Sequence, residues 1–245
     1  MELHVIGSSS AGNCYVLKGK NESLIIEAGL PYKKVQPIID FNPARVAGLL
    51  LTHEHGDHAK YVGQFLKAGI QVVTSNGTAS KIEKSHNVVT IKERQRFYRM
   101  GFEAMAFNTE HDCAEPLGFI IKHAEAGTIL FLTDTHFSKY AFPDVDHFII
   151  EANYSSKILN DRINKGLINA KVGDRVFTSH MEIGTTIELL KASRTENTKT
   201  ITLIHLSDKN SDAFVFKNVV QFATGVSKVE VAEAGKVIQL NKNIF

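Results

Sequence analysis

The chain has 245 residues, a formal net charge of +2 and two cysteines. Its length suits one large domain with a buried core, and we expect residues 1–245 to form a single domain. The charge is too small to indicate a broad nucleic-acid-binding surface, and two cysteines exclude a disulfide framework and favour a reducing compartment. No apolar stretch approaches a membrane-spanning length and no signal peptide is evident, so we expect a cytoplasmic protein without a membrane partner.

Apolar and alternating runs predict many strands in the first half of the chain, with few helices. The predicted strands there are 3–6, 14–17, 23–27, 48–51, 72–74, 88–91, 102–107, 118–122 and 128–132, and the predicted helices are 32–39, 58–67 and 78–84. The second half alternates, with strands 146–151, 200–205, 228–231 and 236–240 and helices 185–191 and 213–222. Adjacent strands followed by strand–helix alternation suggest two sheets packed face to face with helices outside.

The segment from His53 to His58 carries four metal-ligand side chains within six residues. It follows the apolar run 48–52, which predicts a buried strand. Imidazole suits zinc-like cations, and carboxylate oxygen can fill the remaining positions. A segment this short cannot easily aim four side chains at one ion. We therefore expect His53 and His55 to face one ion, and Asp57 and His58 to face a second. A solvated histidine-rich turn is the alternative interpretation.

Three later residues each stand directly after an apolar run, where α/β architectures place their sites. They are His111, Asp134 and His205. Asp134 is the candidate for a carboxylate that bridges two divalent ions about 3.5–4 Å apart. Taken singly, each residue also fits an ordinary loop histidine or a helix-capping aspartate. Their order behind His53–His58 favours a two-metal site.

This ordered series resembles the ligands of metallo-β-lactamase-fold hydrolases. The resemblance spans essentially the whole chain and implies an α/β fold, the αββα sandwich of two mixed β-sheets flanked by helices. It implies two divalent ions, with zinc favoured over manganese or magnesium. By this resemblance the first ion binds His53, His55 and His111, the second binds Asp57, His58 and His205, and Asp134 is shared.

The ligands alone do not select the reaction. Redox flavodiiron relatives carry Glu where His55 stands, and true β-lactamases typically carry Cys where Asp134 stands. Glyoxalase II thioesterases use the same seven ligands, but no second domain that would bind glutathione follows His205.

Glu151, at the end of a predicted strand, and His180, before a predicted helix, bear on the reaction. Phosphodiester hydrolysis expels an alkoxide, and a histidine held protonated by a carboxylate suits the role of general acid. The pair resembles the Glu-Ala-Thr and later His motif of the tRNase Z phosphodiesterases. A buried ion pair that ties two loops together is the alternative.

A closer resemblance lies in segments 7–14, 111–119, 151–153 and 205–210, which are similar to the YycJ/WalJ-type subgroup. This subgroup includes bacterial nucleases that act on DNA ends and phage anti-Pycsar enzymes that destroy cyclic nucleotide signals. The first segment is a small, flexible loop that could approach a phosphate closely, although an ordinary tight turn fits equally. Its candidate substrate-binding residues are Ser8, Ser9, Ser10 and Asn13.

Two segments depart from the bacterial nucleases. Their typical Gly-His-Leu-Ser-Asn is replaced around His180 by the sequence 179–184, and the usual Asp-Ala-Gly reads Glu27-Ala28-Gly29. With the modest charge, these departures favour a small substrate. We therefore predict a dinuclear phosphodiesterase that hydrolyses 3′,5′-cyclic nucleotides to nucleoside monophosphates. By the resemblance, it would destroy a cyclic nucleotide signal, as in anti-Pycsar immune evasion. If the protein is phage-encoded, it would act in the cytoplasm of the host. Its predicted catalytic residues are Asp57, His180 and Glu151.

Two alternatives remain open: a 5′–3′ DNA exonuclease or other polynucleotide phosphodiesterase, with nucleic acid as substrate, and a non-catalytic protein that sequesters nucleotides. The resemblance also implies a homodimer, with the contact supplied by residues 205–245 or by the predicted hairpin 94–99. Arg94, Arg96 and Arg99 of that hairpin could contact phosphate or stack on a base, but a solvated hairpin is the favoured interpretation.

Overall fold

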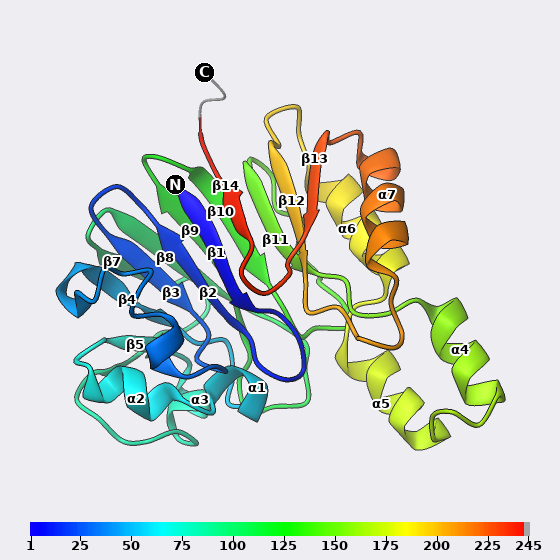
Figure 1. The fold of residues 1–245 in the computed structure, drawn as a ribbon, viewed down its shortest axis with the longest axis horizontal. Coiled ribbons are helices and arrows are strands. Elements are labelled where there is room, and N and C mark those ends of the chain that lie inside the picture. The colour runs from blue at the N-terminus through cyan, green and yellow to red at the C-terminus, as the bar shows by residue number, and fades with distance from the viewer. Residues whose placement is uncertain (243–245) are drawn as a thin grey trace.

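The computed structural model describes residues 1–242, and its strands form two seven-stranded sheets (Figure 1). Residues 243–245, which end both the predicted domain and the predicted contact segment 205–245, lie outside the described residues. The first sheet has the order β14-β1-β2-β3-β4-β5-β6, with the bounds β1 Glu2–Gly7, β2 Cys14–Lys18, β3 Ser23–Ile26, β4 Val46–Leu50, β5 Val72–Thr74, β6 Val88–Thr90 and β14 Val237–Gln239. The second has the order β13-β12-β11-β10-β9-β8-β7, with the bounds β7 Arg96–Arg99, β8 Phe102–Asn108, β9 Leu117–His123, β10 Gly127–Leu132, β11 His147–Glu151, β12 Thr200–Ile204 and β13 Lys228–Val231.

Helices lie outside both sheets. Their bounds are α1 Gly56–Ala59, α2 Val62–Lys67, α3 Asn76–Ala79, α4 Ser156–Asn164, α5 Ala170–Ser179, α6 Ile183–Ser193 and α7 Ala213–Thr224. Figure 1 shows α6 and α7 beside the second sheet, and α4 and α5 as a pair that projects from the lower end of the molecule. In residues 1–242 no helix is both long enough and apolar enough to cross a membrane.

Apolar clusters join the four layers. Between the sheets, the rings of Tyr15 in β2 and Phe131 in β10 meet edge to face at 5.5 Å, within a cluster that draws on both sheets. Phe65 of α2 packs in a cluster with the outer face of the first sheet, and Phe216 and Val220 of α7 pack in one with the outer face of the second. Burying the apolar face of each sheet against the other is the main stabilising term in such a sandwich. The predicted αββα architecture is confirmed.

The predicted strands all form, but three predicted helices were wrong in extent. Segment 32–39 contains only a short 3₁₀ helix, Tyr32–Lys34, because Pro37 lacks the N–H that a continuing helix needs. Segment 58–67 divides into α1 and α2, because the backbone N–H of Tyr61 donates to Ala28 instead of to its own helix. Of segment 78–84 only residues 78 and 79 are helical, at the end of the four-residue helix α3. Helices α4 and α5 were not predicted.

The topology brings several strand ends to one edge. Strands β10, β11 and β12 are mutually parallel, so their carboxyl ends share an edge of the second sheet. Strand β8 runs in the same direction, because β8 and β10 are both antiparallel to β9. In the first sheet, β4 is parallel to β3 and β5 and leads into the segment 53–58. The residues that follow these strands are therefore brought close together.

Candidate metal centre

The segment His53–His58 forms a tight turn at the end of β4, and two of its imidazoles are buried. The N–H of His58 donates to the carbonyl of His55 at 2.9 Å, which opens helix α1. His53 and His58 are 1% and 0% exposed. The carbonyl of Asp57, between them, accepts the N–H of Asn13 at 2.7 Å. These contacts fix the turn against the loop after β1.

The structure brings all seven predicted ligands together in three overlapping groups whose ligand atoms lie within 4.8 Å of one another. The groups are His53, His55 and His111; His53, His58 and Asp134; and Asp57, His58 and His205. The first and third groups correspond to the two ions expected from the sequence. A fourth group joins Asp134 and His205 to Glu151 and His180.

Asp134 lies between the two imidazole sets and is 2% exposed. Its Oδ2 is 2.5 Å from Nε2 of His58 and 3.8 Å from Nε2 of His53. Its Oδ1 is 2.9 Å from Nδ1 of His205. One carboxylate thus faces imidazoles of both sets, which is the arrangement that a bridging ligand needs.

Backbone strain accompanies the site. Glu27, Asp134 and His205 have φ values of 67°, 44° and 54°, in the left-handed region that residues with a side chain rarely adopt. All three are buried; Glu27 and His205 follow directly on strands, and Asp134 lies two residues beyond the end of β10. Such conformations cost of order 1–3 kcal/mol each and persist where the surroundings over-determine them, commonly at functional sites.

Two buried imidazole nitrogens at this site, Nε2 of His53 and Nε2 of His205, make no hydrogen bond within the described residues. In the part of the chain that the structure describes, the oxygens of the buried Asp134 carboxylate are contacted only by imidazole nitrogens, those of His58, His180, His205 and His53. A buried polar atom without a partner costs roughly 1–3 kcal/mol, so a group of them needs an explanation. Imidazole nitrogens and a carboxylate that converge in this way fit one or two divalent cations.

The ionisation states of three ligands, His53, Asp57 and Asp134, suit cations. Burial and the neighbouring imidazole of His58 lower the pKa of His53 well below its ordinary value, so it stays neutral, the form that binds a metal. Burial alone would raise the pKa of Asp57 and of Asp134, but hydrogen bonds and charge from neighbouring histidines outweigh it and lower both. Both carboxylates are therefore ionised at neutral pH. Burial alone would lower the pKa of His58 and of His205, but Asp134 and other neighbouring carboxylates raise both well above the ordinary value.

Glu151 and His180 are paired beside the ligands. Nδ1 of His180 is 2.8 Å from Oε1 of the fully buried Glu151 and 3.0 Å from Oδ1 of Asp134. Burial alone would lower the pKa of His180, but these carboxylates raise it to about 9. His180 is partly exposed and lines the cleft. With Nδ1 engaged by carboxylates, Nε2 is the nitrogen left for a ligand.

Two supporting contacts were not recognised from the sequence. Glu27 lies 3.4 Å from Nδ1 of His58 and accepts the hydroxyl of Thr52 at 2.6 Å. Nδ1 of His111 donates to the carbonyl of Ser179 at 2.9 Å, which leaves Nε2 to ligate. Such contacts orient metal ligands and set the ring nitrogen that faces the ion. Position 27 stood out in the sequence only as Glu in place of the usual Asp.

The four candidate substrate-binding residues have different surroundings. The hydroxyl of Ser8 accepts the N–H of His205 and the Tyr15 hydroxyl, both at 2.8 Å, and Asn13 is 1% exposed with its side chain near Asp57 and His58. Ser9 accepts the N–H of Ala11, within its own loop. Of the four, Ser10 lines the cleft. Ser8 and Asn13 therefore suit positioning of the ligands better than substrate contact.

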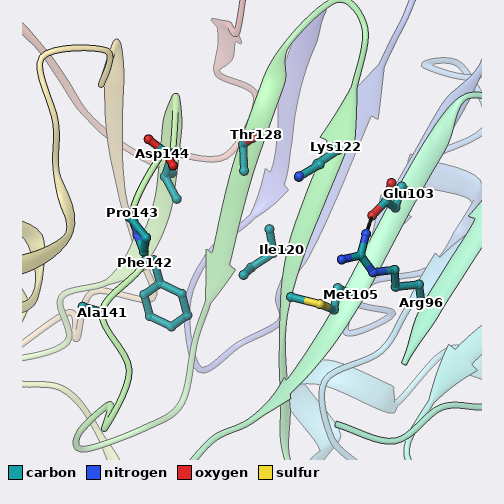
Figure 2. Close-up of a pocket in the computed structure, with 11 residues that line it drawn as sticks. Arg96, Glu103, Met105, Ile120, Lys122, Thr128, Ala141, Phe142, Pro143 and Asp144 are labelled. Carbon is teal, nitrogen blue, oxygen red and sulfur yellow. Dashed lines mark hydrogen bonds and ion pairs between the residues drawn. The ribbon is translucent and has the colours of Figure 1, made fainter. Parts of the chain in front are cut away.

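The ligands open into a cleft of about 270 Å³. Its lining includes His55, Asp57, His111, Asp134, His180, His205 and Ser10, with Val172, Arg175 and Val176 of α5. The three α5 residues were not predicted, because helix α5 itself was not predicted. A second hollow of similar volume lies over β8, β9 and β10, where Met105, Ile120 and Phe142 line it and Arg96 pairs with Glu103 (Figure 2). Its described lining contains none of the candidate ligands.

Comparison with known proteins agrees with this geometry. Residues 9–92 match the model of the metallo-beta-lactamase superfamily. The chain is 26% identical over 225 residues to exodeoxyribonuclease WalJ of Streptococcus pneumoniae, covering 84% of this chain and 82% of that protein. It is 29% identical over 177 residues to exodeoxyribonuclease YycJ of Bacillus anthracis, covering 65% and 66%.

Solved structures share the whole fold at low identity. The metallo-beta-lactamase fold protein YhfI from Bacillus subtilis has a TM-score of 0.75 at 14% identity, covering 97% of this chain and 98% of that one. The short form of human tRNase Z has a TM-score of 0.64 at 17% identity, covering 98% and 99%. With the two sheets and the convergent ligands, these matches identify the architecture: the chain has the metallo-β-lactamase fold.

Proposed function

We propose that this protein is a metal-dependent hydrolase of nucleotide phosphodiesters. The observation that carries the proposal is the contact between Glu151 and His180 at 2.8 Å, directly beside the converging ligands. Divalent ions held by those ligands would acidify water and neutralise charge on the phosphoryl oxygens. Five of the seven ligands are imidazoles, so we propose zinc as the native metal.

The chain's own residues then divide the proton transfers. Asp57, ionised and exposed to the cleft, accepts a hydrogen bond from the attacking water and orients it. The water oxygen bonds to phosphorus and releases a proton to the surrounding water, while the bond to the leaving oxygen breaks. His180 donates its Nε2 proton to that oxygen, and Glu151 keeps Nδ1 protonated and the ring aligned.

For the substrate we propose a 3′,5′-cyclic nucleotide. The cleft of about 270 Å³ is small, and Arg175 is the one lysine or arginine among its described lining residues. A polynucleotide is usually held by several cations that track its phosphates. Val172 and Val176 give the cleft an apolar side that suits a base or sugar. Destruction of a cyclic nucleotide signal, as in anti-Pycsar enzymes, follows from this assignment and from the resemblance of segments 7–14 and 205–210.

A 5′–3′ DNA exonuclease is the second candidate. The relatives WalJ and YycJ are named exodeoxyribonucleases and align over 225 and 177 residues. The structural neighbour from the PhnP family is described as a diphosphatase, with a TM-score of 0.66 at 12% identity and coverage of 97% of this chain and 96% of that one. All of these names concern hydrolysis of phosphorus–oxygen bonds.

One experiment separates the candidates. Protein loaded in turn with zinc, manganese and magnesium is incubated with each 3′,5′-cyclic mononucleotide and, in parallel, with 5′-labelled duplex DNA. We expect linear nucleoside monophosphate and intact DNA. Stepwise loss of the 5′ label with intact cyclic nucleotide would establish the exonuclease instead. Fully loaded protein that cleaves neither substrate would refute both functions, and tight binding without cleavage would indicate a sequestering protein.

We also propose a homodimer formed through α7. Phe214 and Phe222 on its outer face are 78% and 93% exposed, and Val215 and Val219 lie beside them. Aromatic side chains bury roughly 150–250 Å² each, so four of them across a twofold contact supply on the order of 700 Å². The valines bring this towards the roughly 1,000 Å² that a specific interface needs.

Light scattering tests the dimer. We expect twice the mass of one chain for the wild type and a single-chain mass for the double variant Phe214→Ser, Phe222→Ser. A wild-type protein of single-chain mass at micromolar concentration would contradict this proposal.

We place the protein in the cytoplasm as one domain, consistent with the free thiols of Cys14 and Cys113 and with the shared core between the sheets.

A further inference from the structure

Helix α5 presents one face to the cleft. Val172, Arg175 and Val176 line the cleft, and Ser179 at the end of the helix accepts the hydrogen bond from His111. Their spacing of three, four and seven residues places them on one side of a helix. Lys157, on the adjacent helix α4, is exposed and does not line the cleft. The helix that leads into His180 therefore also forms a wall of the site.

Arg175 is held at the mouth of the cleft by one contact. Its Nη2 lies 3.2 Å from Oδ2 of Asp112, in the loop after β8, and both side chains are well exposed, at 67% and 48%. An exposed ion pair contributes at most about 1 kcal/mol, so stability alone gives Arg175 little reason to be there. The guanidinium has five N–H donors in a planar fork, and the single contact leaves most of them free.

The charges around Arg175 point to an anionic ligand. The other ionisable groups in the described lining are carboxylates and imidazoles. Each of these imidazoles except His180 belongs to the predicted ligand set. A phosphodiester has two non-bridging oxygens that carry its charge. Arginine matches such paired oxygens bidentately.

We propose that Arg175 is a substrate-binding residue that holds a non-bridging oxygen of the phosphodiester, while Val172 contacts the base or sugar. This inference rests on the proposed function. It requires no second phosphate, so it applies to a cyclic nucleotide and to any simple phosphodiester alike. Arg175 sets affinity, whereas His180 sets the rate of bond breaking.

Steady-state kinetics with bis(4-nitrophenyl) phosphate and with 3′,5′-cyclic CMP test the assignment. A charge-assisted hydrogen bond is worth about 1.5–3 kcal/mol, so Arg175→Gln should raise KM about 10- to 100-fold, with kcat within about threefold of wild type. Arg175→Lys should be intermediate, because the charge remains without the planar fork. Lys157→Gln, at an exposed position of the adjacent helix α4 that does not line the cleft, is the matched control and should behave as wild type.

Three results would overturn the assignment. One is an unchanged KM in Arg175→Gln. Another is an equal rise of KM in Asp112→Asn, which would mean that Arg175 only ties α5 to the loop after β8. The third is an unchanged Kd for cyclic CMP, measured by calorimetry, when Arg175→Gln is added to His180→Ala. A wild-type protein that hydrolyses neither substrate refutes the proposed function instead, so the two failures are distinguishable.

Discussion

At the scale of single residues, the site separates metal binding from proton transfer. His180 contacts two carboxylates, Asp134 and Glu151, but of these Asp134 alone belongs to the predicted ligand set. Removing the imidazole should therefore leave the seven ligands in place. His180→Ala should retain its divalent metal content, measured by atomic emission, and lose about 10²- to 10⁴-fold in kcat, the usual contribution of a general acid. Loss of metal together with activity would show instead that His180 is a ligand.

Glu27 acts through another residue. It is fully buried, lies 3.4 Å from Nδ1 of His58, and also accepts a hydrogen bond from the hydroxyl of Thr52. Partners of this kind are worth about 10- to 100-fold in metal affinity. We expect Glu27→Gln to weaken zinc binding by that factor in a chelator competition assay, while Glu230→Gln, a control of the same chemistry at a half-buried position outside the described ligand groups, leaves it unchanged. Equal zinc affinities of the two variants would show that Glu27 does not support the metal ligands.

At the scale of elements, the ligands were predictable because each follows an apolar strand with a clear sequence signal. Helices α4 and α5 gave no such signal. Leu159 is the one buried residue of α4, and α5 contains the weak helix formers Val172, Gly173 and Val176, although its two valines share one face. The cleft wall that α5 supplies was therefore missed. The contact of Glu27 with His58 was missed because it depends on two loops meeting in space.

The turn that carries the ligands depends on a close approach at Gly29, just after β3. A Cβ at this position would lie 1.7 Å from the carbonyl oxygen of Asp57, which is a backbone atom and not the end of a flexible side chain. Gly29→Ala should therefore displace the turn and destabilise the fold by about 3 kcal/mol in urea unfolding, with loss of metal binding. Gly56→Ala is the matched control, because a Cβ there has open space although it lies within the same turn. Equal stabilities of the two variants would contradict the close approach.

At the scale of the whole molecule, the two sheets bring ligands from residue 53 to residue 205 to one edge. Sequence patterns predicted which residues converge, because parallel strands end together. They did not predict which side chains far from this edge become buried. His147, at the start of β11, is 0% exposed, and its Nδ1 lies 2.8 Å from the hydroxyl of Thr200.

This burial makes the fold sensitive to acid. Burial lowers the pKa of His147 to about 4, from 6.5, despite the opposing charge of Asp146 and with help from the charge of Lys199. The folded state therefore prefers neutral His147, and its contribution to stability is complete above pH 6.5 and is lost as the pH falls towards 4. Between pH 7.5 and pH 5 this amounts to about 2 kcal/mol. We measure the free energy of unfolding with urea at both pH values in the presence of chelator. For His147→Asn this free energy should fall by about 2 kcal/mol less than for the wild type between pH 7.5 and pH 5. Because the metal ligands are the same in both proteins, their titration cancels in the comparison, and equal losses would show that His147 titrates normally in the folded protein.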